Sequence, residues 1–203
     1  MPVTTLQNFG VPTGDAFSRG GILMPKIKNR FRVFVGNFGF PGSSVGFTQQ
    51  VNSVGRPSVK FSPQPVHSYN SIGYYAGKAE WDEVTVAVRD DVTNSVSRLV
   101  GAQLQRQMNF FEQTVPMAAG DYKFQMTVEC LDGGGTAVED AIVLERWFYE
   151  GCLLSSVNYQ TFDYTSADAM TIELTVRPDN ITQDEGLMPD PAIYAINTPG
   201  LNF

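Results

Sequence analysis

Residues 122–130, YKFQMTVEC, place apolar and polar side chains in strict alternation. Successive side chains of a β-strand point to opposite faces, so a period of two predicts a half-buried strand. The same alternation recurs in residues 31–35, 84–89 and 172–176. Weaker strand patterns cover residues 45–53, 57–62, 65–70, 142–150 and 153–160. The sequence therefore predicts a mainly β protein with antiparallel strands.

One segment departs from this period. Residues 93–113 contain no proline and a single glycine, and Val96, Val100 and Leu104 recur four residues apart. That spacing places the three side chains on one face of a helix. The carboxylate of Asp91 suits the exposed N–H groups where such a helix begins. We expect an antiparallel β-sandwich or barrel with this one α-helix packed on it through the Val96, Val100 and Leu104 face.

The length of 203 residues suits one domain with extensions. Residues 1–25 are rich in Gly, Pro and Thr, show no period, and are interpreted as an N-terminal arm. Residues 26–178 form the predicted β-domain, and residues 179–203 form a Pro-rich C-terminal extension. The extension keeps many apolar side chains, so we expect it to lie on its own subunit or on a neighbour.

The net charge is −7, which argues against a protein that reads nucleic-acid sequence through a basic surface. The charge is uneven along the chain. Residues 1–60 carry seven basic groups and one acidic group, a net charge of +6, which leaves −13 for residues 61–203. The basic part either pairs with acidic neighbours inside one subunit or meets the acidic surface of a successive copy. Both interpretations remain open.

The sequence holds no recognisable catalytic or cofactor motif. It contains no phosphate-binding glycine loop, no HExxH and no GxSxG. Adjacent carboxylates such as Asp82 and Glu83 point to opposite faces of a strand, whereas glycosidase chemistry needs two carboxyl groups facing across a cleft. His67 is the only histidine and is interpreted as a polar strand or loop residue. We therefore expect no enzymatic activity, no cofactor and no metal.

Cys130 and Cys152 are the only cysteines, too few for a Cys-rich zinc site. Cys130 continues the apolar face of its strand and is interpreted as a small core residue. A disulfide between the two, or between subunits, depends on geometry and stays open. The sequence shows neither a secretory signal nor a run of about 18 apolar residues, so no membrane association is expected.

The order of the predicted elements resembles that of a known family. Residues 78–91 (KAEWDEVTVAVRDD) lead from an acidic and aromatic stretch through a strand into the helix. Residues 149–159 (YEGCLLSSVNY) and 162–176 (FDYTSADAMTIELTV) form a late strand and a last hairpin, and residues 24–35 (MPKIKNRFRVFV) supply the first strand. Over about residues 24–178 the chain resembles the tail tube proteins of contractile-tailed bacteriophages, in the superfamily of phage tail tubes and secretion tubes.

The resemblance implies a structural virion protein without enzymatic activity. Members form homohexameric rings in which strands join between subunits, and the rings stack into the channel through which DNA is ejected. Implied partners are further copies, the sheath protein, baseplate and terminator proteins, and, in the lumen, a tape measure protein and DNA bound without sequence specificity. The implied location is the virion tail, after assembly in the host cytoplasm. A baseplate tube initiator or a secretion-system tube protein remains an alternative, as does, with less support, a ligand-binding β-domain.

The resemblance also suggests which side chains serve assembly. By its place in the chain, the segment 55–80 is expected to make contacts between rings, through Arg56, Lys60, His67, Tyr69, Tyr74, Tyr75 and Lys78. The expected lumen-facing residues are polar and alternate with apolar ones: Lys123, Gln125, Thr127, Glu129 and Glu173. An acidic lumen would repel phosphates only near the wall, because salt screens charges over about 10 Å.

Overall fold

The computed structural model describes residues 26–132, 142–165 and 167–184. Backbone contacts divide the chain between Arg30 and Phe31, and the helices and strands of the described residues lie after that division. Their order along the chain is β1 (Phe31–Gly36), β2 (Ser44–Gly46), η2 (Phe47–Gln49), β3 (Val51–Val54), β4 (Val59–His67), β5 (Ile72–Trp81), β6 (Val84–Arg89), α1 (Ser95–Gln107), η3 (Ala119–Asp121), β7 (Phe124–Leu131), β8 (Val143–Asn158), β9 (Thr171–Arg177) and β10 (Asn180–Asp184).

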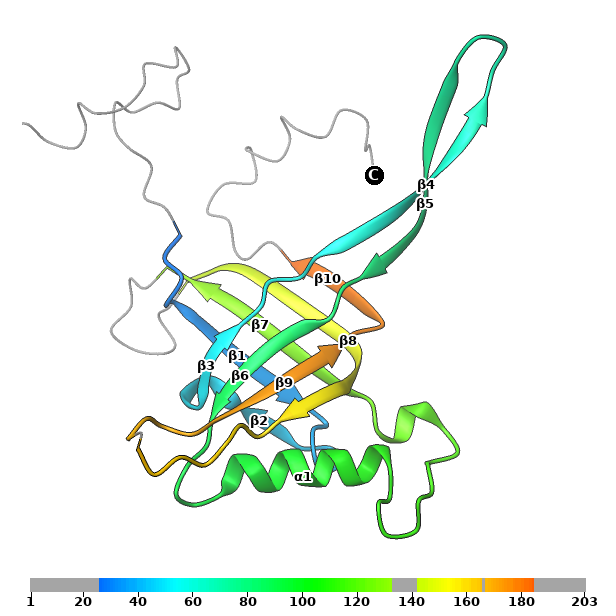
Figure 1. The fold of residues 1–203 in the computed structure, drawn as a ribbon. Helices are drawn as coiled ribbons and strands as arrows, with labels where there is room; N and C mark the ends of the chain where they lie inside the picture. The colour runs from blue at the N-terminus through cyan, green and yellow to red at the C-terminus, as the bar shows by residue number, and fades with distance from the viewer. Residues whose placement is uncertain (1–25, 133–141, 166, 185–203) are drawn as a thin grey trace, which may run out of the picture. The chain divides into compact units, whose positions relative to one another are not determined.

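The main sheet has the strand order β2-β1-β7-β8-β9-β6-β3, and β10 pairs with β8 beside this path. Every pair of neighbours is antiparallel. The sheet curls so that β1 and β7 lie across the core from β6 and β9, with α1 beneath them (Figure 1). This arrangement confirms the predicted fold class, an antiparallel β-sandwich or barrel with one flanking helix. The joining of strands between subunits stays a prediction.

The long strand β8 connects the two halves of the sheet. Its first half pairs with β7 and β10, and its second half pairs with β9. The change occurs at Gly151, which has a positive φ of 63°. A Cβ atom at this position would overlap the carboxylate of Asp179. Glycine is therefore required here for both its backbone conformation and its lack of a side chain.

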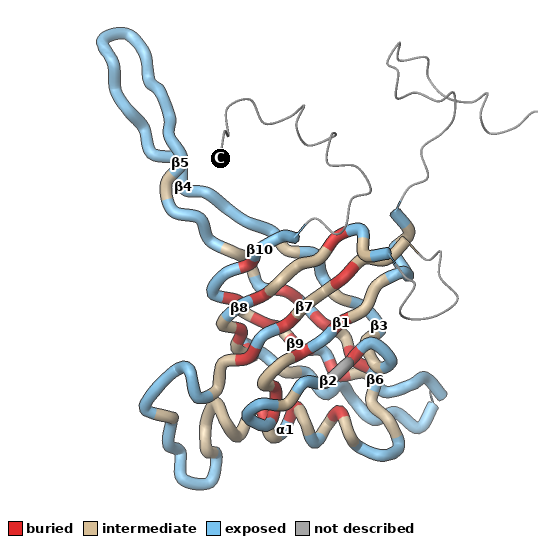
Figure 2. Tube along the Cα trace, turned by 180° about the vertical axis from the view of Figure 1, so that it is seen from behind, coloured by how far each residue is buried: buried red, intermediate tan, exposed pale blue. Residues whose placement is uncertain are grey.

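The core lies between the two halves of the sheet, where the alternating apolar side chains meet. Buried residues come from β1, β6, β7 and β9, and Figure 2 shows them as red segments crossing the strands. In the predicted strand of residues 122–130, Phe124 and Met126 are buried while Gln125 between them is exposed. Phe38 packs edge-to-face against Phe47 and Phe124, with ring centroids 5.5 and 4.9 Å apart.

The helix is shorter than residues 93–113. It begins at Ser95, and its last backbone hydrogen bond runs from the Met108 N–H to the Leu104 carbonyl, 3.0 Å. Met108 is extended, and the side-chain oxygen of Asn109 accepts the N–H groups of Phe111 and Glu112 at 3.1 and 3.3 Å. The prediction of helix up to residue 113 was wrong because this amide supplies the backbone with an alternative to helical hydrogen bonds.

Two strands were not anticipated from the sequence. The predicted strands 57–62 and 65–70 are one strand, β4, and it pairs with the unanticipated β5. The other is β10, which lies beyond the expected domain limit at residue 178 and places residues 180–184 in the main sheet. Ile181 is the one apolar residue of β10 and the one that is buried. The strand therefore shows almost no alternation of apolar and polar residues by which it could be predicted. The predicted N-terminal arm 1–25, the rest of the C-terminal extension, 185–203, and the glycine turn at 133–135 lie outside the described residues.

Candidate assembly surfaces

Strands β4 and β5 form a two-stranded sheet that pairs with no other strand of the described chain. We call this hairpin, Val59–Trp81, the arm. Its register runs from the pair Val59 and Trp81 to the pair His67 and Ile72, and the Ser68 N–H donates to the Ser71 carbonyl across the tip, 2.8 Å. The arm projects from the main sheet on the side away from α1 (Figures 1 and 2). It therefore presents both of its faces to solvent.

The arm combines high exposure with apolar character. Every residue of β4 is exposed, and the side chain of Tyr69 at the tip is 98 % exposed. Residues 61–77 contain no Asp, Glu, Lys or Arg. The exposed large apolar side chains of the arm are Val59, Phe61, Val66, Tyr69, Ile72, Tyr74 and Tyr75. An isolated hairpin is marginally stable in water, and concentrated apolar exposure marks an interaction surface.

The predicted ring-contact residues fall into two groups. His67, Tyr69, Tyr74, Tyr75 and Lys78 are exposed along the arm. Arg56 instead donates to Glu145 of β8 at 2.6 Å, and Lys60 donates to Asp82 at 2.7 Å. The hydrogen bond from Lys60 holds the pKa of Asp82 below its ordinary value. These two cations lie at the base of the arm and tie it to the rest of its own subunit.

The outer face of β7 carries the predicted lumen residues. Gln125 is exposed and Thr127 is half-buried, whereas Glu129 is only 4 % exposed. Lys123 precedes the strand and pairs with Asp179. Glu173 lies on β9, exposed, opposite Ala87 of β6 and Asn158 of β8. The assignment of these side chains to a lumen stays a prediction.

Glu129 is the centre of a row of charges that crosses four strands. It lies directly opposite Arg32 of β1 and Arg146 of β8, and Arg146 lies opposite Asp184 of β10. Both guanidinium groups donate to the Glu129 carboxylate, and Arg146 is 3.6 Å from the Asp184 carboxylate. The charge of Glu129 is thus neutralised by its neighbours. The face of β7 is polar, without the free carboxylate that the alternating pattern suggested.

The inner face of α1 holds residues that the sequence reasoning missed. Val96 and Val100 are buried and Leu104 is half-buried against the core, and Gln103 beside them is fully buried. The Gln103 side chain accepts the Gly39 N–H at 2.9 Å and donates to the Tyr122 carbonyl at 2.6 Å. From the sequence, a polar residue between apolar helix positions is expected to face solvent. The role of Gln103 is seen only in the structure, where it bonds the backbone of Gly39 and Tyr122.

The segment 108–118, which follows α1, is a second exposed apolar surface, and we call it the knob. Phe111 is 94 % exposed and Met117 is fully exposed, with Phe110 and Val115 more than half exposed. The Asn109 N–H donates to the Thr114 carbonyl at 2.9 Å and closes the turn. Residues 108–113 of the knob were expected to be the end of a helix, and the structure instead places them in a protruding turn.

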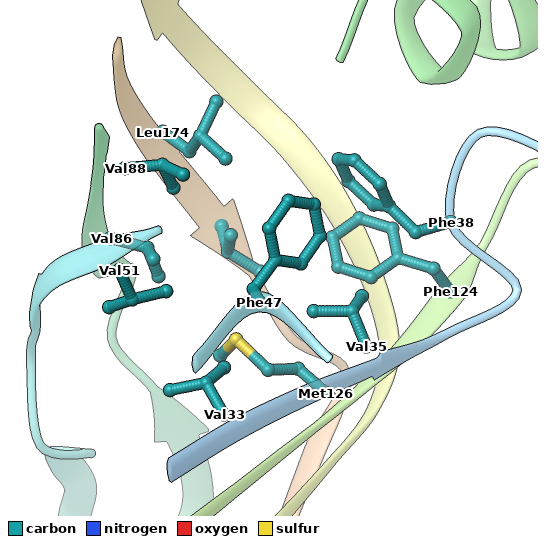
Figure 3. Close-up of a pocket in the computed structure, with 11 residues that line it drawn as sticks. Val33, Val35, Phe38, Phe47, Val51, Val86, Val88, Phe124, Met126 and Leu174 are labelled. Atoms are coloured by element: carbon teal, nitrogen blue, oxygen red, sulfur yellow. The ribbon is translucent and has the colours of Figure 1, made fainter. Parts of the chain in front are cut away.

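One cavity lies within the core of the described residues. Its volume is about 20 Å³, and it is lined by apolar side chains that include Val33, Phe47 and Phe124 (Figure 3). It is about the size of one water molecule. Among residues 26–132, 142–165 and 167–184, no cluster of three or more His, Cys, Asp or Glu side chains is placed to hold a metal. No helix in this part of the chain is long and apolar enough to cross a membrane.

Both cysteines are free thiols. Cys152 is buried, and burial raises the pKa of its thiol to about 12. A thiol with so high a pKa is almost entirely protonated at neutral pH and is therefore unreactive.

Solved structures share this architecture. The chain superposes on the tube-terminating cap of the anti-feeding prophage with a TM-score of 0.60 and 15 % identity, over 87 % of this chain and 99 % of that chain. The chain has the tail tube fold. It matches a protein of the sheath–tube complex of the extracellular contractile injection system PVC (TM-score 0.57, 16 % identity, 84 % of this chain and 99 % of that one). It also matches a protein of the anti-feeding prophage baseplate (0.55, 12 %, 82 % and 100 %).

These matches cover almost the entire length of each neighbour. No protein-family model matches the sequence, and the search of curated proteins gives no significant match. The neighbours are components of a cap, a sheath–tube complex and a baseplate.

Proposed function

We propose that this protein is a tube subunit whose homohexameric rings stack into a phage tail tube, the channel for DNA ejection. The observation that carries the proposal is a tail tube fold from which a charge-poor, exposed apolar arm projects. In a monomer the apolar side chains of this arm would stay exposed to water and contribute no hydrophobic stabilisation. Contacts between rings would bury them.

The ends of the main sheet fit joining between subunits. Strands β2 and β3 terminate the path of paired strands, so each has one edge without a strand partner in the described chain. Unpaired edges promote uncontrolled association, and pairing them around a closed ring removes that hazard. The partners we propose beyond further copies are sheath, baseplate and terminator proteins, since the neighbours come from such assemblies.

Gln125, Thr127 and Glu173 are the proposed lumen residues that remain accessible, and Lys123 and Glu129 have partners within the subunit. A wall of uncharged polar groups with few free charges would let a tape measure protein and DNA pass without adhering. Binding to phosphates needs clustered free cations, whereas Arg32, Arg146 and Lys123 are each paired with a carboxylate. The proposed site of action is the virion tail, after assembly in the host cytoplasm.

A second candidate function is a terminating cap or a baseplate tube initiator. The anti-feeding prophage cap and baseplate proteins superpose on the chain about as well as the PVC tube protein does. A tube subunit polymerises along the whole tail, whereas a cap or an initiator occupies one end. The number of copies per particle therefore separates the two functions.

Electron microscopy of the negatively stained purified protein, with light scattering on the same sample, tests the proposal. Six-fold rings or hollow tubes are expected. A protein that stays monomeric at all concentrations, even after tail baseplates are added as seeds, would contradict it. Long tubes would favour the tube subunit, and single rings bound only at the ends of existing tubes would favour the cap or initiator.

A shortened arm is the matched variant. Replacing residues 64–75 by the turn sequence Asn-Gly joins Pro63 to Ala76, which already face each other across the hairpin. The shortened subunit should keep its core and form single rings or remain unassembled. Normal long tubes from this variant would exclude the arm as the contact between rings.

A further inference from the structure

The knob presents apolar side chains from a rigid turn. The side-chain oxygen of Asn109 accepts the N–H groups of Phe111 and Glu112, at 3.1 and 3.3 Å. It also accepts the side-chain amide of Gln105 on α1 at 2.8 Å. These bonds fix the turn while Phe111 stays 94 % exposed. A partner that binds such a surface loses little conformational entropy in ordering it.

The arm and the knob lie at opposite ends of the same body. The arm leaves the sheet on one side, and α1 with the segment that follows it lies on the other side in both views (Figures 1 and 2). Two different surfaces at opposite ends cannot satisfy each other within one copy. When they are complementary, they form a head-to-tail contact that repeats along an axis.

The charges of the two surfaces are compatible with such a contact. The arm carries no Asp, Glu, Lys or Arg from residue 61 to residue 77, and Lys78 lies near its base, away from the tip. Glu112 is the only charged residue of the knob. Contact would bury apolar surface on both sides without stranding like charges.

We infer that the arm of one subunit packs against the knob, residues 108–118, of a second copy in the adjoining ring. The inference rests on the proposed function and names the surface that receives the arm. In this contact Tyr69 and its neighbours at the tip cover Phe111 and Met117. The exposed apolar area at each end of a ring is then buried by the next ring.

Disulfide trapping between two separately purified variants tests the contact. Tyr69→Cys places a thiol on the arm tip, and Met117→Cys places one on the knob. Under a mild oxidant the mixture should give a covalent dimer that contains one chain of each variant. Each variant alone should give far less. The unsubstituted protein controls for Cys130 and Cys152.

The loop 159–170 supplies the matched control, because Tyr164 is also fully exposed. Mixing Tyr69→Cys with Tyr164→Cys should give little cross-linked dimer. Preferential trapping of Tyr164→Cys would overturn the inference, as would dimers of Tyr69→Cys with itself, which indicate arms meeting head to head.

A second measurement does not depend on thiols. The double variant Phe111→Ser with Met117→Ser should raise the protein concentration needed for tubes by on the order of tenfold or more, the effect of losing a small number of central contacts. Its melting temperature should stay unchanged, since both side chains are exposed. The control is Phe162→Ser with Tyr164→Ser, which should assemble normally.

The knob contact and the tube function are distinguished by different outcomes. Normal tubes from the Phe111 and Met117 variant would overturn the knob as the receiving surface and leave the tube function standing. An unsubstituted protein that forms neither rings nor tubes, with or without baseplate seeds, would overturn both.

Discussion

The side-chain amide of Gln107 forms both backbone hydrogen bonds of Leu154. Its oxygen accepts the Leu154 N–H at 2.8 Å, and its nitrogen donates to the Leu154 carbonyl at 3.0 Å. Leu154 lies on β8 where the register with β9 slips between Leu154 and Ser156. A glutamine on the helix therefore takes the place of a strand neighbour at the irregularity, and it fastens the end of α1 to the sheet.

Substituting Gln107→Ala should lower the free energy of unfolding by roughly 1–3 kcal/mol, because it removes the hydrogen bonds that Gln107 makes to the Leu154 N–H and carbonyl on β8. Urea denaturation measures the change. Arg98→Ala, an exposed change on the same helix, is the control and should have little effect. Equal stabilities for the two variants would mean that water replaces the amide without cost.

Substituting Glu129→Gln should destabilise the fold by about 1–3 kcal/mol, since it leaves Arg32 without its counter-charge and leaves Arg146 only the more distant carboxylate of Asp184. The value is below that of a fully buried pair, because the side chain of Arg146 is 32 % exposed and solvent screens it. Glu173→Gln removes an exposed carboxylate from β9 and should be nearly neutral. Denaturant midpoints of the two variants provide the comparison.

Substituting Leu104→Ala should cost about 1–2 kcal/mol, less than a fully buried leucine, because this side chain is only half-buried against the core. Val100 is fully buried. Substituting Val100→Ala should therefore cost at least as much free energy of unfolding for each atom removed. Thermal unfolding checks both variants. An unchanged melting temperature for Leu104→Ala would show that this side chain does not pack on the sheet.

Substituting Gly77→Ala should disturb the arm and leave the core intact. A Cβ at Gly77 would overlap the carbonyl oxygen of Ser62, a backbone atom that cannot swing away, next to the register shift between Phe61 and Pro63. Hydrogen exchange should become faster in β4 and β5 only. Gly73→Ala is the matched control, since its Cβ would meet nothing closer than the Val66 carbonyl at 4.0 Å.

Asp91 should make the start of α1 sensitive to acid. Its carboxylate accepts the hydroxyl and the N–H of Ser95, at 2.5 and 2.9 Å, and these bonds lower its pKa below the ordinary value of 3.8. A carboxyl whose pKa is depressed by folding stabilises the fold above the unfolded pKa and loses this effect as the pH falls through the folded pKa. The melting temperature of Asp91→Ala should be below that of the unsubstituted protein at pH 7. This difference in melting temperature should begin to shrink as the pH falls below about 4 and should vanish once the carboxyl is protonated in the folded state. A difference that persists at about pH 2 would assign the effect to something other than the carboxylate.

The strands and the helix face could be predicted because each depends on a local period. Phe124 and Met126 are buried on alternate positions of β7, and Val96 and Val100 are buried four residues apart on α1. The helix end could not, because a competing side chain at Asn109 decided it. Only the first strand of the arm was predicted, as the segments 57–62 and 65–70, because β5 carries no alternation that would identify it as a strand.

The candidate assembly surfaces divide in the same way. The resemblance to tail tube proteins suggested, by place in the chain, that the segment 55–80 makes contacts, whereas residues 108–113 of the knob were hidden within a pattern that resembled the end of a helix. The charge of Glu129 also misled the reading of the β7 face, because Arg32 and Arg146 are 97 and 17 residues away and meet it only through strand register.

The sequence by itself determined the antiparallel β class, the single helix and the apolar face on which that helix packs, because side-chain period follows directly from backbone geometry. Only the tertiary structure decided that β8 bends at Gly151 to join both halves of the sheet, that Glu129 is neutralised, and that the arm and the knob lie at opposite ends. These features depend on which distant segments become neighbours, and that is set by burying the shared core and by pairing every strand in register.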